Sequence, residues 1–152
     1  LKKINLTQII SRSLNLLELS EPNIIFTFSK YKTVFSISGD EEQLNRVFIN
    51  LIKNSIESIY DKKIKNVDFK GKINIDIEED NDYIYVNVLD NGLGFDQVDK
   101  TKMLTPYYTT KKKGTGLGLA VVTKIINDHN GTISFNTVSD GAKVIITIPK
   151  IL

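Results

Sequence analysis

Cysteine is absent from this chain of 152 residues, which excludes disulfide bonds as a source of stability. A domain of this length buries roughly 68–70% of the surface that its unfolded chain exposes. A hydrophobic core can therefore stabilise the fold without disulfide bonds or structural metal ions. Hydrophobic residues make up 41% and charged residues 25%, as in ordinary globular proteins. We therefore expect one domain over residues 1–152 and, because cysteine is missing, a reducing cytoplasmic location.

Long apolar runs are missing as well. No run approaches the roughly 20 residues that a membrane-spanning helix needs, and the N-terminus lacks the charged-then-apolar pattern of a signal peptide. We therefore expect this stretch of chain to be soluble and to make no contact with a membrane. Because it begins at Leu1 rather than at methionine, we also expect it to be a fragment of a longer protein, membrane-anchored or not.

A strong excess of charge of either sign is the third absence. The net charge is +2, and the lysines are scattered except at Lys111, Lys112 and Lys113. This balance does not indicate a nucleic-acid partner, and we expect none. Internal repeats, low-complexity tracts and interdomain linkers are absent too, which agrees with a single domain.

The first forty residues predict a helix followed by two strands. Asn5 and Gln8 form a capping pattern, and apolar residues then recur at helical spacing as far as Leu17. Two short β-rich stretches follow, at about residues 24–28 and 33–37. A short turn separates them, so we expect them to pair as a hairpin.

The next segment predicts a long helix and a second pair of strands. Asp40 caps a helix whose apolar stripe continues to about Tyr60, and a polar loop is expected over residues 61–70. Apolar and polar residues alternate at about 73–77 and 83–88, which predicts an antiparallel pair.

The last third begins with a stretch, from Gly92 to Gly114, that has no periodicity. Compact domains seldom leave so long a segment irregular unless it is a functional lid. A third helix is expected from about Leu117, stopped by Asn130-Gly131, and two strands follow at about 132–135 and 143–148.

These elements predict the fold class. Their order is helix, two strands, helix, two strands, lid, helix and two strands. One mixed or mainly antiparallel sheet with all three main helices on one face is the simplest way to bury each apolar stripe once. We therefore expect an α+β domain built as a two-layer α/β sandwich.

Four segments look like parts of a nucleotide site, and the first lies on the long helix. Asn50 and Asn54 are four residues apart, so their amides project from one face, with Glu57 beside them. An amide oxygen is a suitable ligand for Mg²⁺, which keeps most of its water and takes other ligands from substrate phosphates. The alternative is a solvated polar face.

The second segment, Asp90-Asn91-Gly92-Leu93-Gly94, follows a predicted strand. Its glycines would let the backbone approach a flat ligand, and its aspartate can accept a hydrogen bond from an exocyclic amine. Asp-Asn-Gly is also common in ordinary turns, which is the alternative interpretation.

The third segment, from Gly114 to Leu119, is a glycine-rich turn that runs directly into a helix. Exposed amides and the positive end of the helix dipole favour phosphate binding there, although tight packing would also explain the glycines. The spacing of Gly114, Gly116 and Gly118 is not that of a dinucleotide fingerprint, and no βαβ unit surrounds it.

The fourth segment, Thr105 to Lys111, lies just before that turn. It combines aromatic anchors for a mobile lid with a lysine placed to meet phosphate charge. A solvated loop tip is the alternative for the lysine run.

Together the four segments resemble the sequence boxes of bacterial two-component sensor histidine kinases. Asn50 to Ser58 resembles the N box, Asp90 to Gly94 the D-x-G-x-G box, Pro106 to Lys111 the F box, and Gly114 to Leu119 the second glycine box. They occur in the family's order and spacing over residues 40–149. The lid sequence Pro-Tyr-Tyr-Thr-Thr-Lys is most similar to that of the nitrogen-regulation type of sensor kinase.

The resemblance implies the Bergerat ATP-binding fold, which DNA gyrase, one class of heat-shock chaperones and the MutL repair proteins share. It also implies ATP and Mg²⁺ as ligands, with Asn54 on the metal, Asn50 at the phosphates and Asp90 on the adenine amine. Asn50 and Lys111 are then the catalytic residues, and the lid covers about residues 95–114. The residues expected at the nucleotide are Asn50, Asn54, Asp90, Gly92, Gly94, Thr110, Lys111, Gly114, Thr115, Gly116, Leu117 and Gly118.

Two positions depart from the family's pattern or add to it. Leu104 stands where the F box usually has phenylalanine, so we expect a different hydrophobic anchor for the lid. His129 is the only histidine, and no acidic residue follows it in the phosphoacceptor pattern. We interpret it as a structural residue at a helix end and expect the phosphorylated histidine on a dimerisation domain of the same protein.

The resemblance therefore predicts the catalytic domain of a protein histidine kinase, with a response regulator as the downstream partner. Two alternatives stay open. An ATPase of the gyrase or chaperone kind would need a general base, and such relatives have a glutamate where this chain has Asn50. A degenerate interaction domain would not need to keep Asn54, Asp90 and the glycine-rich turn.

Overall fold

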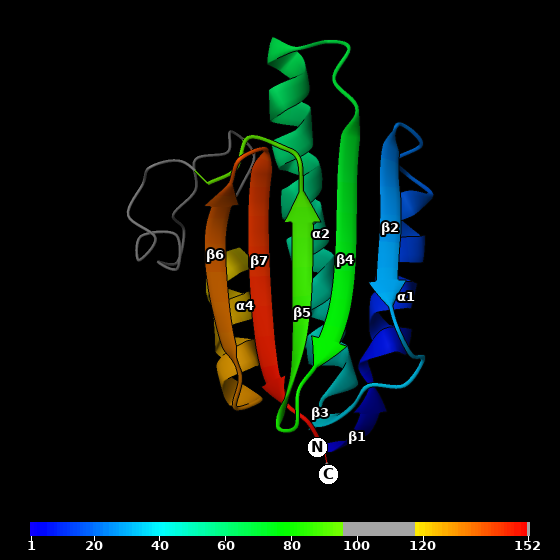
Figure 1. The fold of residues 1–152 in the computed structure, drawn as a ribbon, viewed down its shortest axis with the longest axis vertical. Coiled ribbons are helices and arrows are strands. Elements are labelled where there is room, and N and C mark those ends of the chain that lie inside the picture. The colour runs from blue at the N-terminus through cyan, green and yellow to red at the C-terminus, as the bar shows by residue number, and fades with distance from the viewer. Residues whose placement is uncertain (96–117, 152) are drawn as a thin grey trace.

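The structure is a computed structural model that describes residues 1–95 and 118–151. A five-stranded sheet forms one layer, and the other holds helices α1 (Leu6–Glu18), α2 (Glu41–Lys65) and α4 (Gly118–Asp128). All three lie behind the sheet in Figure 1, with α1 behind one edge, α2 behind the centre and α4 behind the other edge. The predicted two-layer α+β architecture is confirmed. No helix of these described ranges has the length and apolar character to cross a membrane.

The strand order of the large sheet is β2-β4-β5-β7-β6. Only the β2–β4 pair is parallel, and the other three pairs are antiparallel, so the sheet is mixed as predicted. The strands are β2 (Ile24–Lys30), β4 (Gly71–Glu79), β5 (Tyr83–Asp90), β6 (Thr132–Val138) and β7 (Gly141–Pro149).

The core fills the space between the two layers. Alternate residues of β4, Ile73, Ile75 and Ile77, are almost fully buried, and the residues between them face away from the helices. The apolar stripe of α2, which includes Phe48 and Ile52, packs in the same cluster. Burial of each such side chain stabilises the folded chain by roughly 1.5–3 kcal/mol. The alternation of apolar and polar residues in β4 therefore determines which face of the sheet the helices cover.

The predicted hairpin of residues 24–28 and 33–37 is wrong. β2 pairs in parallel with β4, whereas β3 (Ser36–Gly39) leaves the sheet and pairs with an unpredicted strand, β1 (Lys2–Asn5). Contacts with residues distant in sequence decide this pairing. Phe35 and Ile37 are both buried in the core, and the backbone N–H of Phe35 donates to Asn5 Oδ1 (2.9 Å). Strand propensity predicts that a segment is extended but not which segment it joins.

Helix α2 continues to Lys65 rather than ending near Tyr60, so the first half of the predicted 61–70 loop is helical. The extra turn carries lysines, which are good helix formers and complement the negative end of the helix dipole. The two predicted caps are confirmed at the starts of helices. Asn5 accepts a hydrogen bond from the N–H of Thr7, and Asp40 accepts one from the N–H of Gln43.

Glu79 joins three separate parts of the chain at the end of β4. Its carboxylate forms ion pairs with Lys32 and with Lys150 (3.3 Å), and it accepts a hydrogen bond from the hydroxyl of Tyr31 (2.7 Å). The bond from Lys32 contributes most to lowering the pKa of Glu79, which falls from 4.5 to about 2. The C-terminal end is held nearby, since the N–H of Ile151 donates to the carbonyl of Ser36 (3.2 Å).

The Glu79 cluster predicts a specific acid sensitivity. The carboxyl has a lower pKa in the folded chain than in the unfolded one, so its stabilising effect is complete above about pH 4.5 and is lost as the pH falls towards about 2. We expect the loss of stability between pH 5 and pH 2.5 to be smaller in Glu79→Gln than in the native chain, measured by urea unfolding. Glu42→Gln, at an exposed carboxylate, is the control and should keep the native dependence. Equal acid sensitivity of Glu79→Gln and the native chain would contradict the prediction.

Candidate nucleotide-binding site

The polar stripe of α2 supplies one wall of the site. Asn50, Asn54 and Ser58 follow one another at intervals of four residues, so they lie on one side of the helix about 6 Å apart along its axis. All three are half-buried, beside the fully buried stripe of the same helix. Glu57 is exposed, and Asn54 and Glu57 each interact with other groups of the chain.

Asp90 is the last residue of β5 and faces the helices. It pairs with Ile73 on one side and Ala142 on the other, so its backbone is fixed by both neighbouring strands. The side chain is only 9% exposed, and its Oδ1 accepts a hydrogen bond from the N–H of Gly92 (2.9 Å). An ionised carboxylate only accepts hydrogen bonds, which suits it to an amine donor.

The turn after Asp90 packs directly on α2. The N–H of Leu93 donates to Ser58 Oγ (2.9 Å). A Cβ at Gly92 would lie 2.4 Å from that oxygen and 2.7 Å from the backbone carbon of Ser58, so only glycine allows this approach. The aspartate turn therefore meets the polar stripe of α2 one helical turn beyond Asn54.

Asn91 fixes the turn to β4. Its Oδ1 accepts from the N–H of Lys72 (2.7 Å), and its Nδ2 donates to the carbonyl of Lys70 (2.9 Å). Lys62 of α2 adds a bond from its ammonium to the carbonyl of Asn91 (3.0 Å). The side chain of Asn91 is thus occupied in shaping the turn.

The β6–β7 hairpin closes the other side of the turn. Gly141 has a φ of +142°, and a Cβ there would lie 1.9 Å from the carbonyl oxygen of Asp90. Gly94 has a φ of +78°, which favours glycine, and its own Cβ position lies 2.8 Å from the carbonyl oxygen of Gly141. The backbone of the β6–β7 hairpin therefore packs directly against the backbone of the aspartate turn.

Helix α4 brings its first described residue, Gly118, towards the same region. The helix packs against α2, and His129 just beyond its end accepts a hydrogen bond from the N–H of Asp40 (3.0 Å), at the start of α2. The two helices are therefore antiparallel. Eleven residues of α4 span about 16 Å, which places Gly118 close to the level of Asn50 and Asn54.

His129 has the structural role that the sequence predicted. It is buried, its Nε2 accepts the Asp40 N–H, and its Nδ1 lies 2.7 Å from the carbonyl oxygen of Ile125. Because Nε2 is an acceptor, Nδ1 is the protonated nitrogen and donates to that carbonyl. A ring with both nitrogens enclosed and bonded is not placed to receive a phosphoryl group.

The structure places Asp90, Gly92 and Gly94 in and after the end of β5, beside Ser58, with Asn54 one helical turn and Asn50 two turns away along α2. The lid beyond Phe95 lies outside the described residues, as do Leu104 and the predicted site residues Thr110, Lys111, Gly114, Thr115, Gly116 and Leu117.

Sequence reasoning missed three residues that shape the site. Ser58 lay inside the N-box resemblance, and its i+4 spacing from Asn54 was the available signal. Gly141 and Thr137 belong to the β6–β7 hairpin, and Thr137 contacts the end of the turn at Phe95. Nothing in the local sequence of the hairpin indicates a partner more than 40 residues away.

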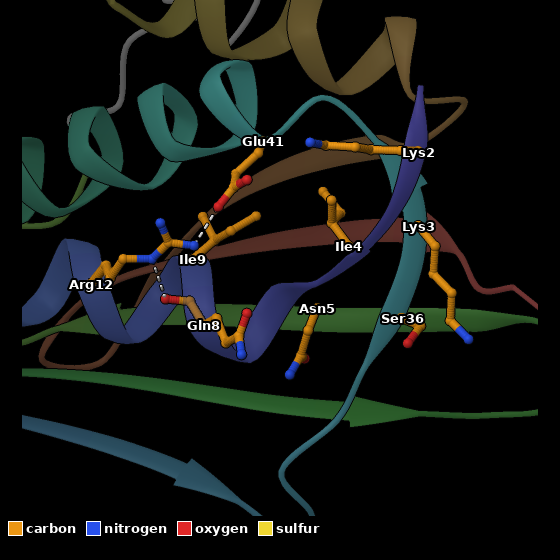
Figure 2. A pocket seen from close by; sticks show the side chains of 9 residues that line it. All are labelled: Lys2, Lys3, Ile4, Asn5, Gln8, Ile9, Arg12, Ser36 and Glu41. Carbon is orange, nitrogen blue, oxygen red and sulfur yellow. Dashed lines mark hydrogen bonds and ion pairs between the residues drawn. The ribbon is translucent and has the colours of Figure 1, made fainter.

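A separate cavity of about 430 Å³ lies near the N-terminus (Figure 2). Arg12 and Glu41 form an ion pair across it. Glu41 is 17 residues from Ser58 on the same helix, about 25 Å away, so this cavity is not part of the nucleotide site. Its lining residues are Lys2, Lys3, Ile4, Asn5, Gln8, Ile9, Arg12, Ser36 and Glu41.

The family model described as histidine kinase-, DNA gyrase B-, and HSP90-like ATPase matches residues 39–151. The chain belongs to this family. Membership implies ATP binding, and the matched range includes all the predicted site residues.

The similarity is to the histidine kinase branch. The chain is 39% identical over 150 residues to sporulation kinase A of Bacillus subtilis, covering 97% of this chain and 23% of that protein. It is 30% identical over 137 residues to the nitrogen regulation protein NtrY of Azorhizobium caulinodans, covering 90% of this chain and 18% of that protein. The domain thus spans less than a quarter of either relative.

Solved structures agree. The catalytic domain of histidine kinase ThkA, in a nucleotide-free form, superposes with a TM-score of 0.84 at 32% identity, covering 98% of this chain and 95% of that one. ThkA in complex with the response regulator protein TrrA superposes with a TM-score of 0.79 at 28% identity, covering 99% and 42%. This chain is accordingly a histidine kinase catalytic domain, as predicted.

Two glycines of this kinase domain should respond oppositely to alanine. Gly92→Ala forces a methyl group into the backbone of Ser58 and should lower the free energy of unfolding by about 1–3 kcal/mol. Gly118→Ala meets no described atom within 4 Å and should raise it by up to about 1 kcal/mol, because alanine favours helix. Urea unfolding measures both, and a fully stable Gly92→Ala variant would show that the turn does not pack on α2 as described.

Proposed function

We propose that this domain binds Mg-ATP at the end of the sheet where Asp90 meets α2, and donates the γ-phosphoryl group to a histidine on a dimerisation domain of the same protein. The observation that supports this most is the buried Asp90 carboxylate, held by the Gly92 N–H and packed beside the polar stripe of α2. That arrangement pairs an acceptor for an exocyclic amine with amides suited to phosphates and metal.

Each residue then has a separate task. Asp90 accepts the hydrogen bond of the adenine amine, while Gly92 and Gly94 let the base lie close to the turn. Asn50 assists at the phosphates, and the amides from Gly114 to Gly118, with Thr110, Thr115 and Leu117, surround the phosphate chain. Lys111 neutralises charge on the terminal phosphate during in-line transfer, a role that a lysine ammonium suits.

The donor set fits magnesium. The described residues contain no group of three or more histidine, cysteine, aspartate or glutamate side chains that could hold a metal ion. Mg²⁺ does not need such a cage, because it keeps several waters and takes ligands from substrate phosphates. Asn54 would supply an amide oxygen to it, and the bound ion would neutralise phosphate charge.

Transfer to histidine is favoured over hydrolysis by the residue at position 50. An ATPase needs a group that orients water and accepts its proton, and the amide of Asn50 cannot accept a proton. The acceptor is a histidine other than His129, which is enclosed. A response regulator is the downstream partner, a proposal that the solved complex of the related ThkA with TrrA supports.

Nucleotide binding is testable by calorimetric titration of the chain with Mg-ATP. We expect a dissociation constant in the micromolar to millimolar range, about −4 to −8 kcal/mol, and a large loss of affinity in Asp90→Asn. Asp76→Asn, on the outer face of the sheet, is the control and should bind like the native chain. No binding at millimolar nucleotide would favour a degenerate interaction domain.

Phosphoryl transfer is testable with radiolabelled ATP and a separately purified dimerisation domain. We expect label on that domain only when this chain is present, slow ATP hydrolysis by this chain alone, and faster hydrolysis in Asn50→Glu, because glutamate can act as a general base. Brisk hydrolysis by the native chain with no transfer would favour the ATPase alternative.

A further inference from the structure

Thr137, near the end of β6, makes an unusual two-point contact with the end of the aspartate turn. Its hydroxyl donates to the carbonyl of Phe95 (2.9 Å) and accepts from the N–H of the same residue (3.2 Å). One side chain thus satisfies both backbone groups of Phe95, as a neighbouring strand would.

The rest of Thr137 and its strand close around the same point. The methyl carbon of Thr137 would lie 3.1 Å from a Cβ at Gly94, so the glycine packs directly against it. The ring of Phe95 meets the buried ring of Phe135 edge to face, with centroids 5.6 Å apart. Hydroxyl, methyl and aromatic contacts from β6 therefore hold two consecutive residues.

The turn between Asp90 and Phe95 is consequently held at three places. The strands beside β5 fix its start at Asp90, Ser58 fixes its middle, and Thr137 fixes its end. The Gly92 N–H that binds the carboxylate of Asp90 lies between these supports. A shift at Phe95 would move Gly94 and then Gly92, and with it the orientation of the carboxylate.

We propose that Thr137 is a positioning residue for adenine recognition: by clamping Phe95, it keeps the Gly92 N–H on Asp90 and the carboxylate aimed at the exocyclic amine. This inference rests on the proposed function. A purely structural role in the β6–β7 hairpin is the competing account. That account predicts that a substitution at Thr137 changes the affinity for every nucleotide by the same factor.

The test compares the affinity of the chain for ATP with its affinity for inosine triphosphate, which has a carbonyl in place of the exocyclic amine. The ratio of the ATP affinity to the inosine triphosphate affinity therefore measures the contribution of the Asp90–amine bond. Thr137→Val keeps the shape but loses both hydrogen bonds, and we expect it to lower the ratio by about 2–10-fold, the range for one hydrogen bond. Thr137→Ser keeps the hydroxyl and should retain the native ratio. Thr132→Val, at an exposed threonine of the same strand, is the matched control and should also retain it.

Calorimetry on the whole chain gives the affinities, and thermal unfolding shows whether each variant is folded. In an Asp90→Ala background, Thr137→Val should leave the ratio unchanged, because no carboxylate remains for it to position. A native ratio in Thr137→Val, or equal losses for both nucleotides, would overturn the inference while leaving the proposed function intact. Failure of the native chain to bind either nucleotide would overturn both.

Discussion

The approach of the aspartate turn to helix α2 is the contact on which the rest of the site depends. Gly92 lies so close to Ser58 that a methyl group would overlap its backbone, and the hydroxyl of Ser58 holds the next amide. This contact joins a strand end to a helix face. It thereby brings the carboxylate of Asp90 to the same side of the domain as the polar stripe of α2.

The sequence predicted the elements well and their partners poorly, for a physical reason. Periodicity records which side of a segment is buried, so the helices, the layers and the face of β4 followed from it. It does not record which strand lies alongside, and the parallel pairing of β2 with β4 and the short strand β1 were therefore missed. The extra turn of α2 was missed because its lysines break the apolar stripe.

For the candidate site, residues with polar functional groups could be proposed from the sequence, and the residues that support them could not. Asn54 and Asp90 could be proposed because the family resemblance assigns roles to side chains at their positions. Thr137 and Gly141 act on backbone atoms of a segment distant in sequence, and Asn91 acts on the edge of β4. Such contacts depend on which strands lie side by side, so the composition of the sequence and the spacing of its residues do not predict them.

The small sheet of β1 and β3 also determines how the domain can be handled. The first residues lie in β1, and Ile151 binds Ser36 of β3, so both chain ends emerge side by side (Figure 1). The tip of β5, which ends at Asp90, points away from both termini and lies at the other end of the sheet (Figure 1). A fluorescent reporter or surface tether fused to either terminus would thus lie away from the Asp90 end of β5, and both termini serve equally well for immobilising the domain.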